Sequence, residues 1–179
     1  MTAELGHFAL ILSFVVSILL GVLPLVGAQR GQAQWVALAR PAAQTQFLLI
    51  AFAFACLAQS FLVNDFSVSY VAQHSNTQLP TLYRFAAVWG GHEGSLLLWV
   101  LMLSGWGAAV SVASRQLPEV MVARVLAVLG LVGIGLLAFI LFTSNPFDRL
   151  MPAAAEGRDL NPLLQDPGLV FHPPMLYMG

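Results

Sequence analysis

The residues most suited to chemistry are concentrated at residues 89–99, which read Trp-Gly-Gly-His-Glu-Gly-Ser-Leu-Leu-Leu-Trp. The leucines and the second tryptophan are sufficient to anchor a helix that enters lipid. His92 and Glu93 are not needed for that purpose, so we expect a polar function at this edge of a membrane. A structural reading covers part of the motif, because Glu93 near a helix amino terminus meets the helix dipole and Ser95 can cap free amides. It leaves His92 unexplained, and both a functional and a structural role stay open for that residue.

A second candidate is His172, in the run Phe171-His172-Pro173-Pro174. Proline disfavours helical geometry at the residue before it, and two prolines in succession favour an extended segment. An imidazole held stiffly at a membrane surface loses little entropy on binding a metal, which makes His172 a candidate ligand. The alternative is a helix-entry turn in which the prolines occupy the first turn and the histidine is incidental.

The remaining histidines have simpler explanations. His7 is expected to bond to a neighbouring backbone group or water, and His74 to be a solvated loop residue. Trp106 follows Trp99 by seven residues on the same helical face. It is expected near mid-bilayer, where it packs on a neighbouring helix or walls a large flat apolar ligand.

The elements that must position these residues are membrane helices. Apolar residues make up 59% of the chain and charged residues 8%, with a mean hydropathy of +0.82, whereas soluble domains carry about 25% charged residues. A single span must satisfy its own backbone hydrogen bonds and needs roughly 20 residues. We therefore predict an all-α membrane protein with four transmembrane helices, two ordered outer-face loops and the start of a fifth helix. The predicted spans are residues 5–26, 42–63, 95–113 and 122–142, followed by an outer loop at 143–179 that holds the candidate ligand.

The first apolar stretch is expected to be a retained span. It lacks a positive amino-terminal region, and its apolar part is too long for a secretory signal.

Among the loops, residues 82–89 have the spacing of a short amphipathic interfacial helix, with Arg84 reaching to water. In the fourth span Ala123, Ala127 and Gly130 form a small-residue face that indicates close helix packing.

The net charge and the single cysteine argue against several classes of function. A net charge of −1 gives no reason to expect nucleic-acid binding. The lone Cys56 offers neither a disulfide framework nor a Cys-x-x-Cys-His haem attachment site.

The short connectors after the first and third spans carry arginines, at 30, 40, 115 and 124, so the positive-inside rule puts them in the cytoplasm. The amino terminus and both candidate histidines, His92 and His172, are then expected on the periplasmic side of a bacterial inner membrane.

Residues 89–99 closely resemble the signature of the CcmF subunits of the bacterial haem lyase in cytochrome c maturation, a family that includes the NrfE-type subunits. Further motifs occur in the order of the family and cover essentially the whole chain. They are Val63-Asn64-Asp65-Phe66, Ser75-Asn76-Thr77-Gln78-Leu79-Pro80, Thr143-Ser144-Asn145-Pro146-Phe147, and Gly157-Arg158-Asp159-Leu160-Asn161-Pro162-Leu163-Leu164-Gln165-Asp166-Pro167-Gly168-Leu169, which leads into Phe171-His172-Pro173-Pro174-Met175-Leu176-Tyr177-Met178-Gly179.

The resemblance implies a function in cytochrome c biogenesis. Members of the family receive haem at the outer face of the plasma membrane from a small haem chaperone. Together with other maturation subunits they help to attach its vinyl groups to two thiols of apocytochrome c. The expected cofactor is haem b, and His172 resembles one of its two outer-face axial ligands.

Two further roles are expected on this basis. Arg158 precedes His172 in the outer segment and is a candidate contact for a haem propionate, since a guanidinium binds carboxylates bidentately; the alternative is a surface pair with Asp159. Glycine gives an imidazole no rigidity but lets another backbone approach closely. We therefore expect an interaction edge, rather than a haem ligand, that fixes the outer loops or receives a partner. That edge comprises Trp89, Gly90, Gly91, His92 and Glu93.

The resemblance covers only part of the family's haem-binding machinery, and other functions are alternatives. The other haem ligands of the family lie outside residues 1–179, so we expect an amino-terminal fragment or one piece of a split subunit, inactive in haem ligation by itself. A subunit dedicated to nitrite reductase is an alternative within the same chemistry. A membrane transport subunit with broken segments at 89–95 and 171–174 is another, although no charge lies in the central parts of the four spans. A structural scaffold would leave His172 without a role.

Overall fold

The computed structural model describes residues 1–178, apart from the side chain of residue 163; Gly179, the last residue of the His-Pro-Pro run, lies outside the described residues. Within this part of the chain four helical segments are long and apolar enough to cross a membrane. The prediction of an all-α protein with four spans is confirmed. The spans are α1 (Thr2–Arg30), α3 (Ala39–Leu62) preceded by the short α2 (Ala33–Ala37), α6 (His92–Ala113) and α7 (Glu119–Thr143).

All four long helices begin three residues before the predicted spans, and two of these differences have local reasons. The second span begins at Ala39 instead of residue 42, because Pro41 lies in the first helical turn, where no backbone amide has a partner within the helix. The third begins at His92, directly after Gly91 in extended geometry. Ser95 does not cap free amides there; its hydroxyl donates to the carbonyl of Trp89, at 2.8 Å.

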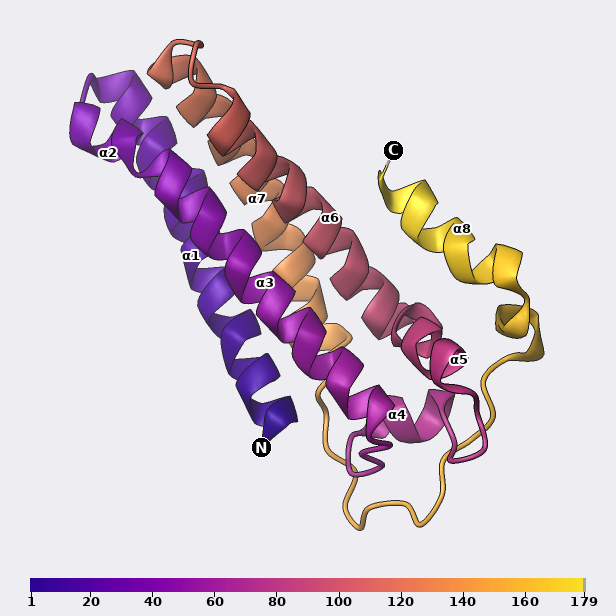
Figure 1. Cartoon of the computed structure of the whole chain (residues 1–179). Coiled ribbons are helices and arrows are strands. Elements are labelled where there is room, and N and C mark those ends of the chain that lie inside the picture. The colour runs from indigo at the N-terminus through magenta and orange to yellow at the C-terminus, as the bar shows by residue number, and fades with distance from the viewer. Residues whose placement is uncertain (179) are drawn as a thin grey trace.

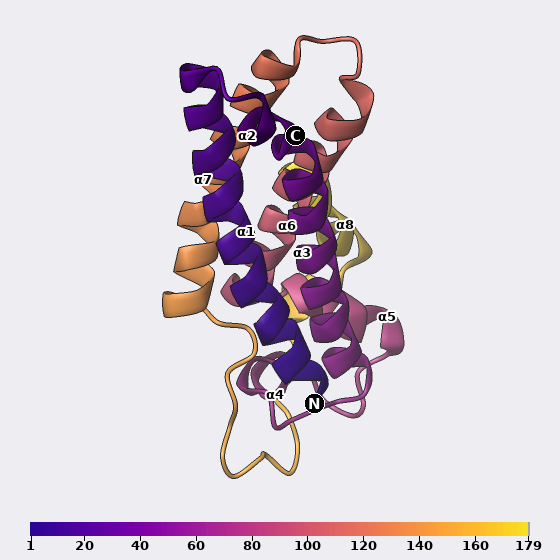
Figure 2. The same ribbon diagram turned by 90° about the vertical axis from the view of Figure 1, so that its left-hand side faces the viewer.

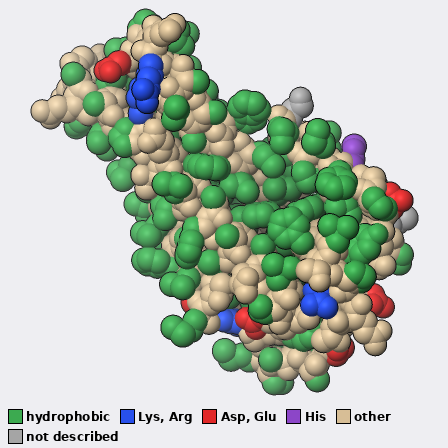
Figure 3. All heavy atoms as spheres, viewed as in Figure 1, with side chains coloured by type: hydrophobic (Ala, Val, Ile, Leu, Met, Phe, Trp, Pro, Cys, Tyr) green, Lys and Arg blue, Asp and Glu red, His purple; other side chains and the backbone are tan. Residues whose placement is uncertain are grey.

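The four long helices form an up-and-down bundle (Figures 1 and 2). Helix α1 packs against α3 and α7, and α6 closes the bundle against the same two helices. The connectors at 31–38 and 114–118 therefore lie at one end, which we call the connector end. Residues 63–91 and 144–166 lie at the other, the loop end. Hydrophobic side chains cover the band between the ends, whereas charged side chains gather at both of them (Figure 3).

Small residues let α1 and α7 approach closely. Ala123 and Ala127 are fully buried. A Cβ atom added to Gly130 would lie 2.9 Å from both the backbone nitrogen of Gly21 and Cγ of Leu20. The small-residue face predicted for the fourth span is confirmed, and it packs on α1.

Polar bonds join the helices inside the bundle as well. Gln46 of α3 is 5% exposed and donates to the Ser17 hydroxyl of α1. At the connector end the Arg40 guanidinium donates to the carbonyls of Ser111 and Ser114, the latter at 3.0 Å. Arg40 thus satisfies carbonyls that the carboxyl end of α6 leaves without helical partners.

The two segments of the loop end pair with each other. The amide of Ser69 donates to the carbonyl of Asp148, and the amide of Leu150 to that of Ser67, both at 2.8 Å. Arg84 donates to the carbonyls of Leu79 and Thr77 instead of reaching into water, because these turn carbonyls have no helical donor. The ordered elements are α4 (Ser69–His74), α5 (Thr81–Ala86), η1 (Ala87–Trp89), η2 (Pro162–Gln165) and α8 (Pro167–Met178).

Replacing Gly130 with leucine should separate α1 from α7. The larger side chain meets backbone atoms of Gly21 that cannot move aside, so we expect a loss of about 1–3 kcal/mol in the free energy of unfolding. Denaturation of the detergent-solubilised protein measures it. Gly135→Leu is the matched control, because a Cβ atom at Gly135 meets nothing within 4 Å. Equal stability of the two variants would contradict the assigned packing.

Candidate functional site

The Trp-Gly-Gly edge, defined as residues 89–95, holds the helix that carries His172. The indole Nε1 of Trp89 donates to the carbonyl oxygen of Val170 in α8, at 3.1 Å. Trp89 is 9% exposed and Val170 4%, so water is excluded from this bond. The ring of Phe85 meets the indole edge-on, with centroids 5.3 Å apart. Two segments 81 residues apart in the sequence are thereby joined.

His172 lies inside a helix, so the predicted extended segment is wrong. Helix α8 begins after Asp166, whose Oδ1 accepts the amide of Gly168 at 2.8 Å, and it contains Pro173 and Pro174. Proline has no N–H, so the helix loses the bonds that residues 173 and 174 would donate. The indole of Trp89 supplies a donor to one of the carbonyls left free. A long-range contact therefore overrides the local preference of the prolines.

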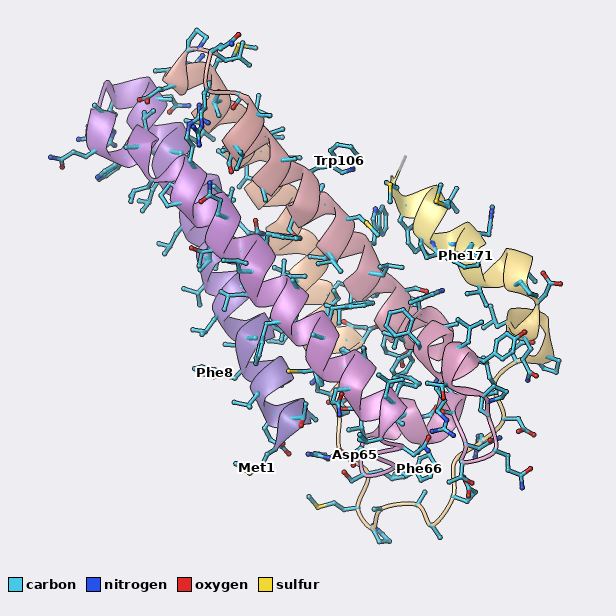
Figure 4. The ribbon with its side chains drawn as sticks, viewed as in Figure 1. Met1, Phe8, Asp65, Phe66, Trp106 and Phe171 are labelled. Carbon is cyan, nitrogen blue, oxygen red and sulfur yellow. The ribbon has the colours of Figure 1, made fainter. Side chains whose placement is uncertain are left out.

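The two faces of α8 differ in exposure. Val170, Pro173, Pro174 and Tyr177 are buried or half-buried, and the ring of Tyr177 stacks on Trp99 of α6 with centroids 6.1 Å apart. His172 lies on the opposite, exposed face, and the structure of residues 1–178 gives it no hydrogen bond or ion pair. Its exposed apolar neighbours are Leu169, Phe171 (labelled in Figure 4), Met175 and Leu176, which are 39–65% exposed.

His92 faces α7. Its Nδ1 lies 3.1 Å from the hydroxyl of Ser144, and its ring meets Phe139 edge-on with centroids 5.8 Å apart. These contacts link the first turn of α6 to the last turn of α7, and they give His92 the structural explanation that the sequence lacked. The structure does not bring His92 and His172 together in any contact.

A buried tyrosine organises the backbone of the edge. The hydroxyl of Tyr70 donates to the carbonyl of Val88 at 3.0 Å and accepts the amide of Gly91 at 2.9 Å. Burial raises the pKa of Tyr70, so the phenol stays protonated and keeps its donor. His74 is half-buried and not a solvated loop residue, because its Nδ1 donates to the Tyr70 carbonyl at 3.0 Å and its ring packs on the tyrosine.

A separate polar cluster lies where α1 meets the loop end. His7 bonds to the side chain of Asn145, at 3.3 Å, and not to a neighbouring backbone group. Arg149 forms ion pairs with Glu4 and, at 3.4 Å, with Asp65. Figure 4 labels Met1 and Phe8 on the adjoining turns of α1. The Arg149 guanidinium is therefore engaged within this chain.

Arg158 lies in a cleft of about 380 Å³ between the two loop segments. Residues 76–78 and 156–159 line it, and none of them belongs to α8, so this cleft does not bring Arg158 and His172 together. Glu156 accepts the hydroxyl and amide of Thr77, at 2.8 and 3.0 Å, which lowers its pKa. Asp159 accepts from Asn76 instead of pairing with Arg158. The Arg158 side chain is exposed.

Trp106 is 55% exposed and points out of α6 on the side of α8 (Figure 4). It lines an apolar groove of about 570 Å³ between α3, α6 and the end of α8. The groove offers almost no polar group that could bind or react with a ligand, because its lining is almost entirely hydrocarbon. The described residues also contain no group of three or more His, Cys, Asp or Glu side chains that could hold a metal ion. A metal at His172 would therefore need further ligands from elsewhere.

Sequence reasoning missed the bond between Trp89 and Val170. One signal was present, because Pro174 stands four residues after Val170 and so removes the helical donor to that carbonyl. Nothing local indicates which distant donor replaces it.

Comparison with known proteins places these features in context. Residues 89–179 match the model of the family described as cytochrome C assembly protein. The chain is 62% identical over its whole length to cytochrome c-type biogenesis protein CcmF of Pseudomonas aeruginosa, covering 27% of it. It is 57% identical to CcmF of Escherichia coli K12, again over its whole length and covering 28% of it. It therefore spans about a quarter of the length of these curated relatives.

A solved structure shows the same fold. It is a cytochrome c haem lyase CcmF, matched with a TM-score of 0.83 and 25% sequence identity over 99% of this chain and 28% of that one. The NrfE protein of Haemophilus influenzae is 47% identical over the whole chain, which covers 28% of it.

Gly94→Ala should disrupt the edge. An added Cβ atom would overlap the carbonyl oxygen of Val88, a backbone atom already bonded to Tyr70. We expect a loss of stability of about 1–3 kcal/mol, measured by denaturation in detergent, despite the higher helix propensity of alanine. Gly105→Ala in the same helix is the control, because its Cβ atom makes only ordinary contacts with Phe47, at 3.6 Å. A Gly94→Ala protein as stable as that control would refute the close approach.

Proposed function

Because this chain belongs to the cytochrome C assembly protein family, we propose that it works in attaching haem to c-type cytochromes. It does so as the membrane segment that presents His172 as an axial ligand. The observation that carries the proposal is the imidazole of His172, unpaired among the described residues, on a helix held in place by Trp89. The activity belongs to the whole protein, of which relatives have about four times this length.

The surroundings of His172 fit a haem. A haem is a large flat apolar ring with one charged edge, and the exposed neighbours of His172 on α8 are apolar. Iron is commonly held by the imidazole of a histidine. The imidazole of His172 forms no hydrogen bond or ion pair with residues 1–178, so it is free to bind iron. When bound, haem b supplies the iron and the vinyl groups that become joined to protein thiols. The residues of this chain bind and orient it.

The face that binds haem lies away from the four-helix bundle. His172 points away from Val170 and Tyr177, the residues through which α8 contacts η1 and α6. The second axial ligand is therefore expected outside residues 1–178. Arg158 remains a proposed propionate contact, supported by its exposed guanidinium at the loop end, which no ion pair within the described residues occupies.

We propose that the protein spans the bacterial inner membrane with its loop end in the periplasm. Support comes from Arg30, Arg40, Arg115 and Arg124, which lie in or beside the two connectors at the opposite end. Positive charge in short loops favours the cytoplasmic side. A haem chaperone and apocytochrome c would then meet the protein at the loop end, where His172 and the Trp-Gly-Gly edge lie close to each other.

A role dedicated to nitrite reductase is the second candidate. NrfE proteins resemble this chain over most or all of its length, at 47% identity in Haemophilus influenzae. Several CcmF relatives are more similar, up to 62%, so general cytochrome c maturation is the better supported function.

Replacing His172 with alanine in the full-length protein should reduce the co-purified haem and abolish cytochrome c maturation. Loss of one axial imidazole leaves the iron open to other ligands, so added imidazole should restore part of the binding. Absorbance of the purified protein and haem staining of cytochromes measure both effects. His92→Ala is the comparison, since that imidazole contacts α7, and it should retain most of the haem. Normal cytochrome yield from His172→Ala would refute the assignment.

Topology is tested separately. Reporter fusions at Arg30 and Arg115, which lie at the connector end, should report the cytoplasm. Fusions at His74 and Glu156, at the loop end, should report the periplasm. Reversal of both pairs would overturn the orientation and remove His172 from the compartment where cytochromes c mature.

A further inference from the structure

We propose that Trp89 is a positioning residue for His172, its indole N–H replacing the backbone amide that Pro174 lacks. The inference rests on the proposed function of His172 as a haem ligand.

Helix geometry leaves the Val170 carbonyl without a backbone donor. In an unbroken helix the carbonyl of residue 170 accepts the amide of residue 174, but residue 174 is proline and has none. The Val170 side of α8 is buried, so water cannot take the place of that donor. The indole Nε1 of Trp89 lies 3.1 Å from the Val170 oxygen and supplies it. A buried carbonyl without a partner is costly, so the tryptophan stabilises this turn.

The other carbonyl released by a proline has no such need. Pro173 removes the donor to Leu169, but Leu169 is 39% exposed and lies on the open side of α8. The buried side of the helix therefore has one carbonyl to satisfy, that of Val170, and one indole is sufficient.

The consequence for His172 follows from where α8 is held. Val170 lies two residues before the histidine and bonds to Trp89; Tyr177 lies five residues after it and stacks on Trp99. Successive residues turn by about 100°, so His172 stands about 200° from Val170, facing away from the bundle. Rotation of α8 about its axis would break both contacts. The two tryptophans therefore fix the direction in which the imidazole points.

The test uses the full-length protein and added haemin as the probe. Trp89→Phe keeps an aromatic ring against Phe85 but removes the N–H. We expect about tenfold weaker haemin binding, which corresponds to about 1.4 kcal/mol, a changed Soret spectrum, and recovery on adding imidazole. Trp35→Phe is the matched control, because Trp35 lies in α2 at the connector end, away from α8; its haemin affinity should not change.

A second variant separates the proposed bond from general packing. Pro174→Ala restores a backbone amide that can donate to Val170, so adding Trp89→Phe to that background should change haemin affinity less than twofold. In haem-free protein, hydrogen exchange of residues 167–178 should speed up in Trp89→Phe but not when it is combined with Pro174→Ala. Equal losses in both backgrounds, or no loss in either, would overturn the proposal.

The outcome also distinguishes this inference from the proposed function. If His172→Ala leaves haemin binding intact, the proposed function fails, while hydrogen exchange still reports whether Trp89 holds α8. If His172→Ala abolishes binding but Trp89→Phe behaves like Trp35→Phe, only the positioning role is lost.

Discussion

The geometry of the candidate site depends on one hydrogen bond between the indole of Trp89 and the carbonyl of Val170. Two prolines would ordinarily end or kink a helix, and the segment around His172 carries both of them inside α8. The helix is retained because a distant side chain supplies the donor that Pro174 cannot. His172 is thereby held on a helix with a defined exposed face, instead of on an extended strand with no fixed direction.

That bond requires Trp89 to be held accurately in place, and contacts within the loop end hold it there. The up-and-down bundle brings residues 63–91 and 144–166 to one end, where their backbones pair. Tyr70 ties Val88, one residue before the tryptophan, to Gly91, two residues after it, and Gly94 lets the start of α6 pass against the Val88 carbonyl. The motif of residues 89–95 thus makes close backbone contacts and hydrogen bonds that hold the loop end together.

The four spans were predictable from sequence because length and apolarity decide them. Close helix packing at Gly130 was indicated by its small neighbours, but its partner α1 was found only in the structure. The conformation at His172 was not. The preference of a residue before proline is a local rule, and it was overridden by a contact across 81 residues of sequence. His74 and Arg84 were misjudged for a different reason, because their partners are close in sequence. Tyr70 lies one helical turn before His74 in α4, and the carbonyls of Leu79 and Thr77 lie in the turn just before α5. The short helices of this loop were not predicted with the accuracy that these contacts require.

The most direct measurement is an electron cryomicroscopy structure of the full-length protein with haem bound. We expect haem density joined to the imidazole of His172 on the face of α8 turned away from the bundle. The same map should show the indole of Trp89 in contact with the Val170 carbonyl. Haem held by other residues, with His172 turned toward the bundle or α8 unwound at the prolines, would contradict this expectation.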